Sequence, residues 1–293
     1  MLYRIENDFL RVAVSDLGAE LQSILGKKTG TEYLWQGDPA YWAGRAPVLF
    51  PVCGRLTGGE YLWQGKTYRM DIHGFLARTV LTVEQNDGTS VSFLCRADEQ
   101  TRAIYPFEFE FRLTYTLTGN ALRCLYTVVN TGAGELPFSF GGHPGFNVPF
   151  VPGEPFEDYY LEFDRPFSPH LLEITPDGFL SGKELPFSLR DGRIIPLRHE
   201  LFDPDGLFFR DPCHKVSLRS LRNDRSVTVQ FDDMNYLGFW QDGKAASPFL
   251  CIEPWHGICP VAGKTDDFAT KAEMVRLPAG RTYSTWFDIR IDE

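Results

Sequence analysis

The chain has 293 residues, of which 43% are hydrophobic and 23% are charged, and its formal net charge is −10. A chain of this length buries roughly three quarters of its unfolded surface, so it needs no disulfide or metal ion to fold. The acidic excess disfavours nucleic acids and anionic membranes as partners, because both prefer a basic protein surface.

The composition favours strands and turns. The chain contains 24 Phe, 12 Tyr and 6 Trp, together with 27 Gly and 20 Pro. Aromatic residues favour strands, whereas Gly and Pro favour turns. Near the N-terminus the sequence Glu-Tyr-Leu-Trp-Gln-Gly occurs at 32–37 and again at 60–65. A solenoid needs at least three repeats, so two copies do not indicate one. They predict two similar pieces, each a strand followed by a turn.

Alternation of apolar and polar residues predicts antiparallel hairpins. Phe, Leu and Tyr alternate with polar residues over 107–117, and a Thr-Gly-Asn turn at 118–120 leads to a partner strand over 122–128. This arrangement is typical of a hairpin with one buried face. Short turns containing Asn and Asp predict two further hairpins, which join 81–84 to 91–95 and 216–221 to 227–231.

Helix signals are few. Asp38–Trp42 predicts a single turn with Pro just inside its start, and Asp267–Met274 predicts a short helix. A parallel sheet would need many alternating helices. The segment 149–155 is rich in Pro and Gly, but the aromatic pattern resumes at 159–163, so we expect no linker there. We therefore predict an all-β fold, a large antiparallel β-sandwich that forms one domain over residues 1–293.

The cysteines and the N-terminus indicate a cytoplasmic protein. The six cysteines form no C-x-x-C pair, and Cys95, Cys124 and Cys251 lie in apolar runs typical of buried, reduced thiols. Residues 1–8 are charged where a signal peptide would become apolar. No apolar run approaches the roughly 18 residues of a membrane helix.

Four short stretches place polar side chains where predicted strands end. Arg55 follows a strand bounded by prolines, and its guanidinium fork suits hydroxyls, carboxylates or phosphates. His73 precedes a glycine at a strand junction. His143 and Glu253 each precede a proline, which restricts the preceding residue to extended geometry.

Glu253 and His143 predict general acid–base chemistry. Glu253 follows Leu-Cys-Ile, and a carboxylate is costly to bury without a partner or a purpose. An imidazole exchanges protons near neutral pH, so a glutamate base and a histidine acid on opposite sides of a substrate could transfer protons. Trp255 suits the apolar face of a sugar ring. We assign the remaining histidines to structure or surface: His170, His199, His214 and His256.

Several other enzyme classes lack their motifs. The sequence has no Gly-x-Ser-x-Gly elbow of a serine hydrolase and no His-Glu-x-x-His or comparable metal cluster. It also has no phosphate-binding P-loop and no dinucleotide fingerprint, so we expect no metal and no cofactor. A glycosidase with two carboxylates stays open, because Asp203 or Asp205 could act beside Glu253.

Taken together and in this order, the four stretches resemble the aldose 1-epimerase (mutarotase) family, and within it the bacterial LacX-type branch. The resemblance extends from near residue 1 to the end. It is carried by the Pro-x-Leu-Phe-Pro run that leads to Gly54-Arg55, by His73-Gly74-Phe75, by His143-Pro144-Gly145-Phe146-Asn147 and by Ile252-Glu253-Pro254-Trp255. It implies a galactose mutarotase-like β-supersandwich that binds a sugar in a groove of one concave sheet. It also implies interconversion of α and β anomers through ring opening.

The resemblance also implies roles for individual residues. Glu253 would be the base that takes the proton from the anomeric hydroxyl, and His143 would be the acid that protonates the ring oxygen. The residues expected to bind the substrate are Arg55, His73, Asp205, Asn147 and Trp255. Asp205 would correspond to the aspartate that holds hydroxyls in the galactose branch, with Asp203 as the neighbouring alternative.

The sequence departs from the galactose-specific members in three places. Those members carry Asn-Arg where this chain has Gly54-Arg55, a longer signature around the first histidine, and a histidine after the aspartate. The favoured hexose is therefore left open, as is the choice between a monomer and a homodimer. A hexose 6-phosphate mutarotase would need a basic pocket, for which Arg55, Arg69 and Arg78 are candidates. A non-catalytic sugar-binding or sensor protein is a further alternative, although it would have no need of a proton-transfer pair.

Overall fold

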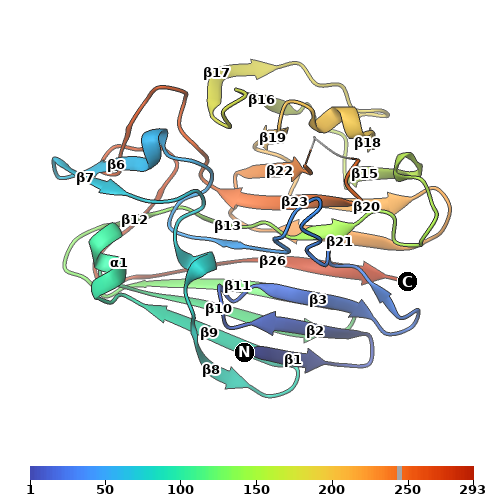
Figure 1. The fold of residues 1–293 in the computed structure, drawn as a ribbon, viewed down its shortest axis with the longest axis horizontal. Helices are drawn as coiled ribbons and strands as arrows, with labels where there is room; N and C mark the ends of the chain where they lie inside the picture. Colours follow the sequence, from blue (N-terminus) through green and yellow to red (C-terminus); the bar gives the residue numbers. More distant parts are fainter. Residues whose placement is uncertain (243–245) are drawn as a thin grey trace.

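The computed structural model describes residues 1–242 and 246–293, which form stacked antiparallel sheets (Figure 1). One large sheet has nine strands in the order β18-β15-β20-β21-β26-β11-β10-β9-β8. Its strands are β8 (Thr82–Asn86), β9 (Ser90–Arg96), β10 (Phe109–Thr118), β11 (Ala121–Asn130), β15 (Tyr159–Phe163), β18 (Ile194–Pro196), β20 (Lys215–Ser220), β21 (Ser226–Phe231) and β26 (Thr282–Asp292). The prediction of a large antiparallel β-sandwich is confirmed.

The second large sheet has eight strands and carries the candidate site. Its order is β17-β16-β19-β22-β23-β13-β5, and β14 also pairs with β23. Its strands are β5 (Val48–Leu49), β13 (Phe140–Gly142), β14 (Gly145–Asn147), β16 (His170–Ile174), β17 (Leu180–Leu185), β19 (Gly206–Arg210), β22 (Tyr236–Trp240) and β23 (Phe249–His256). Contacts such as the Tyr126 hydroxyl donating to the Gly141 carbonyl at 3.2 Å join it to the nine-stranded sheet.

Three small sheets and a few short helices complete the described chain. The strands are β1 (Leu2–Glu6), β2 (Leu10–Ser15), β3 (Leu21–Gly26) and β4 (Thr31–Glu32); β6 (Glu60–Trp63), β7 (Lys66–Arg69) and β24 (Asp266–Asp267); and β12 (Leu136–Phe138) and β25 (Val275–Leu277). The helices are α1 (Glu99–Ile104) and the 3-10 turns η1 (Thr57–Gly59), η2 (Leu76–Arg78), η3 (Phe156–Asp158) and η4 (His199–Phe202). Within the described ranges, no helix has the length and hydropathy that a bilayer crossing would require.

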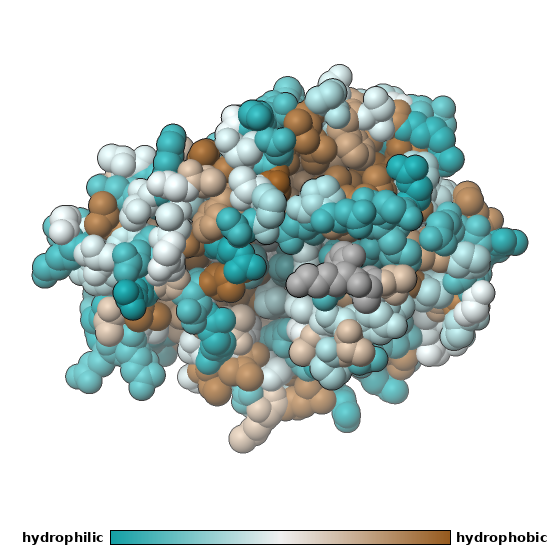
Figure 2. Space-filling view, turned by 45° about the horizontal axis from the view of Figure 1, so that its top comes forward, coloured by the Kyte–Doolittle hydropathy of each residue, from teal (hydrophilic) through white to brown (hydrophobic). Residues whose placement is uncertain are grey.

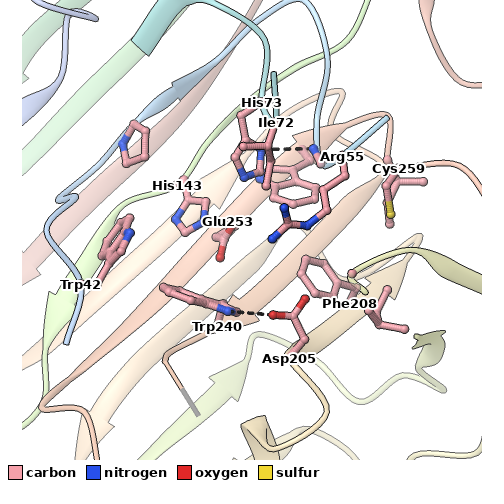
Figure 3. Close-up of a pocket in the computed structure, with 16 residues that line it drawn as sticks. Trp42, Arg55, Ile72, His73, His143, Asp205, Phe208, Trp240, Glu253 and Cys259 are labelled. Carbon is pink, nitrogen blue, oxygen red and sulfur yellow. Dashed lines mark hydrogen bonds and ion pairs between the residues drawn. The ribbon is translucent and has the colours of Figure 1, made fainter. Parts of the chain in front are cut away.

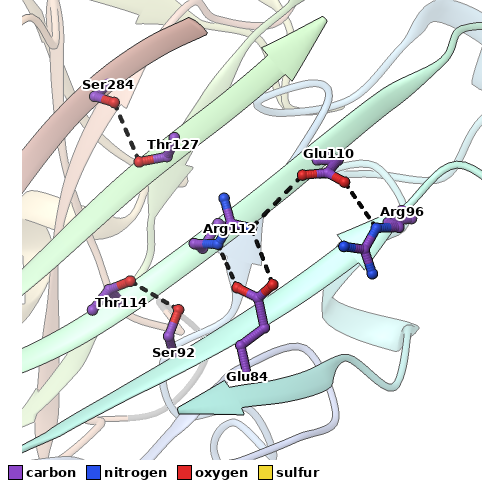
Figure 4. Close-up of polar contacts among 8 residues, drawn as sticks. All are labelled: Glu84, Ser92, Arg96, Glu110, Arg112, Thr114, Thr127 and Ser284. Atoms are coloured by element: carbon purple, nitrogen blue, oxygen red, sulfur yellow. Dashed lines mark hydrogen bonds and ion pairs between the residues drawn. The ribbon is translucent and has the colours of Figure 1, made fainter. Parts of the chain in front are cut away.

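The alternation seen in the sequence divides each large sheet into a core face and an outer face. On β10, Phe109, Phe111 and Leu113 are buried, whereas the outer face carries polar side chains. Figure 4 shows this outer face, where Arg112 bonds to Glu84 and lies 3.7 Å from Glu110. These ion pairs lie where solvent reaches them, so they identify the solvated side of the sheet. Ion pairs at a protein surface contribute little to stability.

The outer surface is mainly hydrophilic. Figure 2 shows hydrophilic residues over most of the face in view, with hydrophobic residues in separate patches. The large hydrophobic residues that are exposed are Met1, Leu2, Phe9, Leu17, Val80, Leu185 and Leu221. All six cysteines are buried and free.

Local predictions had mixed outcomes. The three predicted hairpins are confirmed as β10–β11, β8–β9 and β20–β21. At Asp38–Trp42, the Asp38 carbonyl accepts hydrogen bonds from the Tyr41 and Trp42 amides, so the predicted turn is confirmed. The helix predicted at Asp267–Met274 is wrong, because these residues form the end of β24 and isolated turns. The helix α1 was not predicted. Its N-cap Asp98 accepts a hydrogen bond from the Thr101 amide, but a helix of six residues gives too short a sequence pattern to be detected among strands.

Candidate active site

A cavity of about 280 Å³ lies on the outer face of the eight-stranded sheet (Figure 3). Its polar lining consists of Arg55, His73, His143, Asp205 and Glu253. Its large apolar lining consists of Trp42, Pro47, Ile72, Ile174, Phe208, Trp240, Trp255 and Ile258. Apolar walls with a few convergent polar groups are typical of a small-molecule site, and this volume is at the small end of that class.

Strand β23 positions Glu253 by its alternation. Leu250 and Ile252 pack into the core between the large sheets, so Glu253 and Trp255 project from the opposite face and line the cavity. Gly238 on β22 pairs with Glu253, and a Cβ atom on Gly238 would lie 3.4 Å from the Glu253 Cβ atom. The short strand β14 pairs with the first half of β23, which brings His143 to the same place.

The two predicted proton carriers are in direct contact. The His143 Nε2 atom lies 3.1 Å from the Glu253 Oε2 atom. We expected the two side chains on opposite sides of a substrate, whereas the register of β14 on β23 places them side by side. The His143 main-chain amide donates to the Pro47 carbonyl at 3.2 Å, which anchors the residue between β13 and β14.

Burial favours the uncharged form of this pair. Desolvation raises the pKa of Glu253 well above its ordinary value, and the negative charge of Asp205 adds to the effect. Desolvation also lowers the pKa of His143 to about 4. Neither Glu253 carboxylate oxygen nor His143 Nδ1 has a well-directed hydrogen bond to the described part of the chain. The site therefore holds buried polar atoms that a ligand could satisfy.

His73 is held as a fixed hydrogen-bond donor. Its amide donates to the Gly54 carbonyl at 3.0 Å, and its Nδ1 atom accepts from the Gly54 amide at 3.1 Å. An Nδ1 atom that accepts cannot carry the proton, so the neutral ring carries it on Nε2. Desolvation lowers the pKa of His73 well below its ordinary value, and the charges of His143 and Arg55 add to this effect.

Arg55 and Asp205 lie at the other end of the cavity. Figure 3 shows the Arg55 guanidinium projecting between Glu253 and Asp205. The Asp205 Oδ1 atom accepts from the Trp240 indole at 3.2 Å. Gly178 leaves room for both charged groups, since a Cβ atom there would lie 2.9 Å from Arg55 Nε and 3.7 Å from Asp205 Oδ2. Between the two candidate aspartates, Asp205 lines the cavity, while Asp203 lines a neighbouring hollow.

Asn147, which we expected to bind the substrate, lies outside the lining of the cavity. The Asn147 side-chain amide donates to the carbonyl of Glu32 at 2.8 Å and to that of Leu34 at 3.1 Å. These bonds tie β14 to the segment after β4, away from the residues that line the cavity. Asn147 has a structural role because its donors are already used by the main chain.

Sequence reasoning missed the aromatic walls around His143. The Trp42 ring centroid lies 5.1 Å from that of His143, and the Trp240 centroid lies 5.7 Å from it. Gly44 and Gly145 leave space for Trp42, since Cβ atoms there would lie 2.6 Å and 3.1 Å from its ring. The turn at Asp38–Trp42 was visible in the sequence, but nothing in it indicated that Trp42 would reach another sheet.

Comparison with known proteins shows which family this chain resembles over its length. The aldose 1-epimerase family matches residues 1–287. The chromosomal LacX protein of Lactococcus lactis subsp. lactis is 32% identical, and the match covers 99% of both chains.

Solved structures give the same result. A galactose mutarotase-related enzyme from Lactobacillus acidophilus has a TM-score of 0.94 and 36% identity, covering 100% of this chain and 98% of that one. A galactose mutarotase-like protein from Lactobacillus casei also has a TM-score of 0.94, with 31% identity and 100% of both chains covered.

Proposed function

The chain belongs to the aldose 1-epimerase family, and from that premise we propose that it interconverts the α and β anomers of a free hexose by acid–base ring opening and reclosure. Membership and the structural relatives make it an isomerase that acts on carbohydrates. The observation that carries the finer proposal is the 3.1 Å contact between His143 Nε2 and Glu253 Oε2 inside the cavity.

In the proposed reaction, Glu253 removes the proton from the anomeric hydroxyl while His143 protonates the ring oxygen. The bond between C1 and the ring oxygen breaks, and an open-chain aldehyde forms. Rotation about the C1–C2 bond presents the other aldehyde face. Reclosure returns the proton from Glu253 to the new hydroxyl and the proton from the ring oxygen to His143, so protons balance over the cycle.

Burial of the pair supports this direction of proton flow. Ring opening converts a carboxylate and an imidazolium into a carboxylic acid and a neutral imidazole. The raised pKa of Glu253 and the lowered pKa of His143 both favour these neutral forms. The neutral pair and the charged pair hold the same number of protons, so one proton shift across the 3.1 Å contact interconverts them. The cavity thus stabilises the protein groups as they are after ring opening.

The other polar groups would bind and orient the sugar. His73 presents its Nε2–H, Arg55 presents a guanidinium and Asp205 presents a carboxylate oxygen, all from the lining of one cavity. A donor, a cationic fork and an acceptor suit the hydroxyls and the ring oxygen of a pyranose. Trp255 and its aromatic neighbours supply the apolar surface on which C–H groups of a sugar can pack.

The charges in the cavity favour a free sugar over a sugar phosphate. Of the arginines considered for a phosphate site, Arg55 lines the cavity, where Asp205 and Glu253 add acidic groups. Arg69 pairs with Glu60 and Arg78 pairs with Asp71, each at 3.0 Å. Neither lines the cavity, and a phosphate would place its negative charges beside two carboxyl groups.

Polarimetry of freshly dissolved α-glucose, α-galactose and α-glucose 6-phosphate tests the proposal. We expect the protein to accelerate mutarotation of at least one free hexose and to act less on the phosphate. Faster action on the phosphate would favour the alternative substrate class. Binding of a free hexose by calorimetry without any acceleration would favour a sugar-binding protein and would refute the enzymatic proposal.

A further inference from the structure

Cys251 lies beside His143 and Glu253 but has no role in the proposed reaction. Alternation along β23 places Cys251 two residues before Glu253 on the same face, and Cys251 is fully buried. Gly145 of β14 pairs with Cys251, so His143 arrives next to both side chains. One donor atom from each of His143, Cys251 and Glu253 lies within 4.8 Å of the other two.

These three donors match the chemistry and much of the geometry of a zinc site. Zinc takes imidazole nitrogen, thiolate sulfur and carboxylate oxygen at about 2.0 to 2.3 Å, so tetrahedral ligands lie about 3.3 to 3.8 Å apart. The contact of 3.1 Å between His143 and Glu253 is already close to this separation. The three donor atoms lie within 4.8 Å of one another, so binding requires the longest separation to close by about 1 Å.

A second observation points to a ligand at this place. The Glu253 carboxylate is completely buried, its 3.1 Å contact with His143 Nε2 is not a well-directed hydrogen bond, and its Oε1 atom has no hydrogen-bond partner in residues 1–242 and 246–293. Buried carboxylates are normally paired or bind a metal ion. His143 and Glu253 also line the cavity, so an ion there would have an open fourth position toward it.

We propose that His143, Cys251 and Glu253 bind one zinc ion, and that the bound ion inhibits the enzyme. Binding would use the His143 lone pair and the Glu253 carboxylate, the two groups that must move protons. It would release the thiol proton and the carboxyl proton to solvent. Magnesium would not compete, because it prefers an octahedron of oxygen ligands. The inhibition rests on the proposed function, whereas the ion binding does not.

Zinc binding is tested with protein freed of metal by a chelator and then titrated with ZnCl₂ against a chromogenic zinc indicator. We expect one ion per chain, and at least about tenfold weaker binding by Cys251→Ala, because the loss of a direct ligand should cost no less than the loss of a supporting residue. Cys251→Ser is the second variant, in case the alanine variant does not fold. Cys213→Ser is the matched control: Cys213 is also buried, and its thiol donates to the Arg165 carbonyl. Equal zinc affinity in the wild type and both Cys251 variants would overturn the proposal.

Measurements of mutarotation with and without zinc distinguish the failure of the zinc site from the failure of the proposed function. We expect ZnCl₂ to stop mutarotation by the wild type, a chelator to restore it, and MgCl₂ to leave it unchanged. Cys251→Ala should keep the metal-free rate and need at least about tenfold more zinc for inhibition. If zinc binding depends on Cys251 but the protein is inactive on every sugar tested, the zinc site is supported and the proposed function is refuted. Full activity with no zinc binding would refute the site alone.

Discussion

Replacing Glu253 with glutamine tests the central assignment with little disturbance of the fold. Glutamine has nearly the same shape and is neutral, and burial already raises the pKa of Glu253 so that its neutral form is favoured. The amide can keep the contact with His143 Nε2 that the carboxyl makes at 3.1 Å. We therefore expect Glu253→Gln to be as stable as the wild type or slightly more stable, because the cost of burying a carboxylate is removed.

The catalytic loss should be large because glutamine cannot accept the proton. A positioned general base contributes about 10² to 10⁴ in rate, which corresponds to about 3 to 5 kcal/mol of activation free energy. The other carboxylate that lines the cavity, Asp205, accepts a hydrogen bond from Trp240. Asp205 also lies at the other end of the cavity, with the Arg55 guanidinium between it and Glu253, so it is not placed to take over the role of Glu253.

Glu253→Asp is the matched control for position rather than chemistry. It keeps the carboxyl but withdraws it by about 1.5 Å, the length of one C–C bond. A misplacement of about 1 Å can cost about 10² in rate, so we expect this variant to be weakly active. Initial polarimetric rates and thermal unfolding would be measured on all three proteins. A Glu253→Gln variant that is folded and within about threefold of the wild-type rate would refute the assignment, since a base contributes far more.

Three further outcomes are expected. His73→Gln should keep more activity than His73→Asn in the same rate assay, because the amide nitrogen of glutamine falls near the Nε2 position that His73 uses as a donor. A higher activity of His73→Asn would contradict the assignment of the proton to Nε2. Asn147→Ala should lower the free energy of unfolding in urea by about 1 to 3 kcal/mol through the loss of two hydrogen bonds, and a changed KM would instead place Asn147 in the site. In Glu253→Gln, the free energy of unfolding should fall by about 3 kcal/mol or more as the pH is lowered from 6.5 to 4. The unfolded state protonates His143 near pH 6.5 and the folded state only at about 4, and the lowered pKa of His73 acts in the same sense. This variant is used because in the wild type the raised pKa of Glu253 acts in the opposite sense, and a flat profile between pH 4 and 6.5 would show that neither histidine pKa is lowered.

Alternation and turn residues allowed the fold class to be predicted, because both are local. The hairpin β10–β11 has one buried face and one polar face over its whole length, so its register follows from the sequence. The repeated hexapeptide shows the limit of such reasoning. Residues 60–65 form the first strand and turn of the β6–β7 hairpin. In the other copy Leu34 bridges to Phe146 and Trp35 stacks on Phe249 at 4.8 Å. Identical residues therefore adopt different structures because their distant partners differ.

Residues that line the cavity were predictable where a proline or glycine stands next to them in the sequence. His143, Glu253, His73 and Arg55 all line one cavity, as their positions at strand ends suggested. The contact between His143 and Glu253 was not predictable, since it depends on the pairing of β14 with a strand a hundred residues away. The position of Asn147 was not predictable for the same reason, because the carbonyls that accept from its side-chain amide belong to Glu32 and Leu34, 115 and 113 positions earlier in the chain.

Two histidines share this cavity, and the structure separates what each can do. His143 is buried and His73 is partly buried, and desolvation lowers the pKa of each. His73 also accepts the Gly54 amide at Nδ1, so adding a proton there would break a hydrogen bond and bring two donors together. His143 has no such restraint, and its Nε2 atom faces a carboxyl group at 3.1 Å. We therefore propose that His143 transfers the proton and that His73 is a constant hydrogen-bond donor, because His143 can change its protonation state without losing the bond to the main chain that His73 would lose.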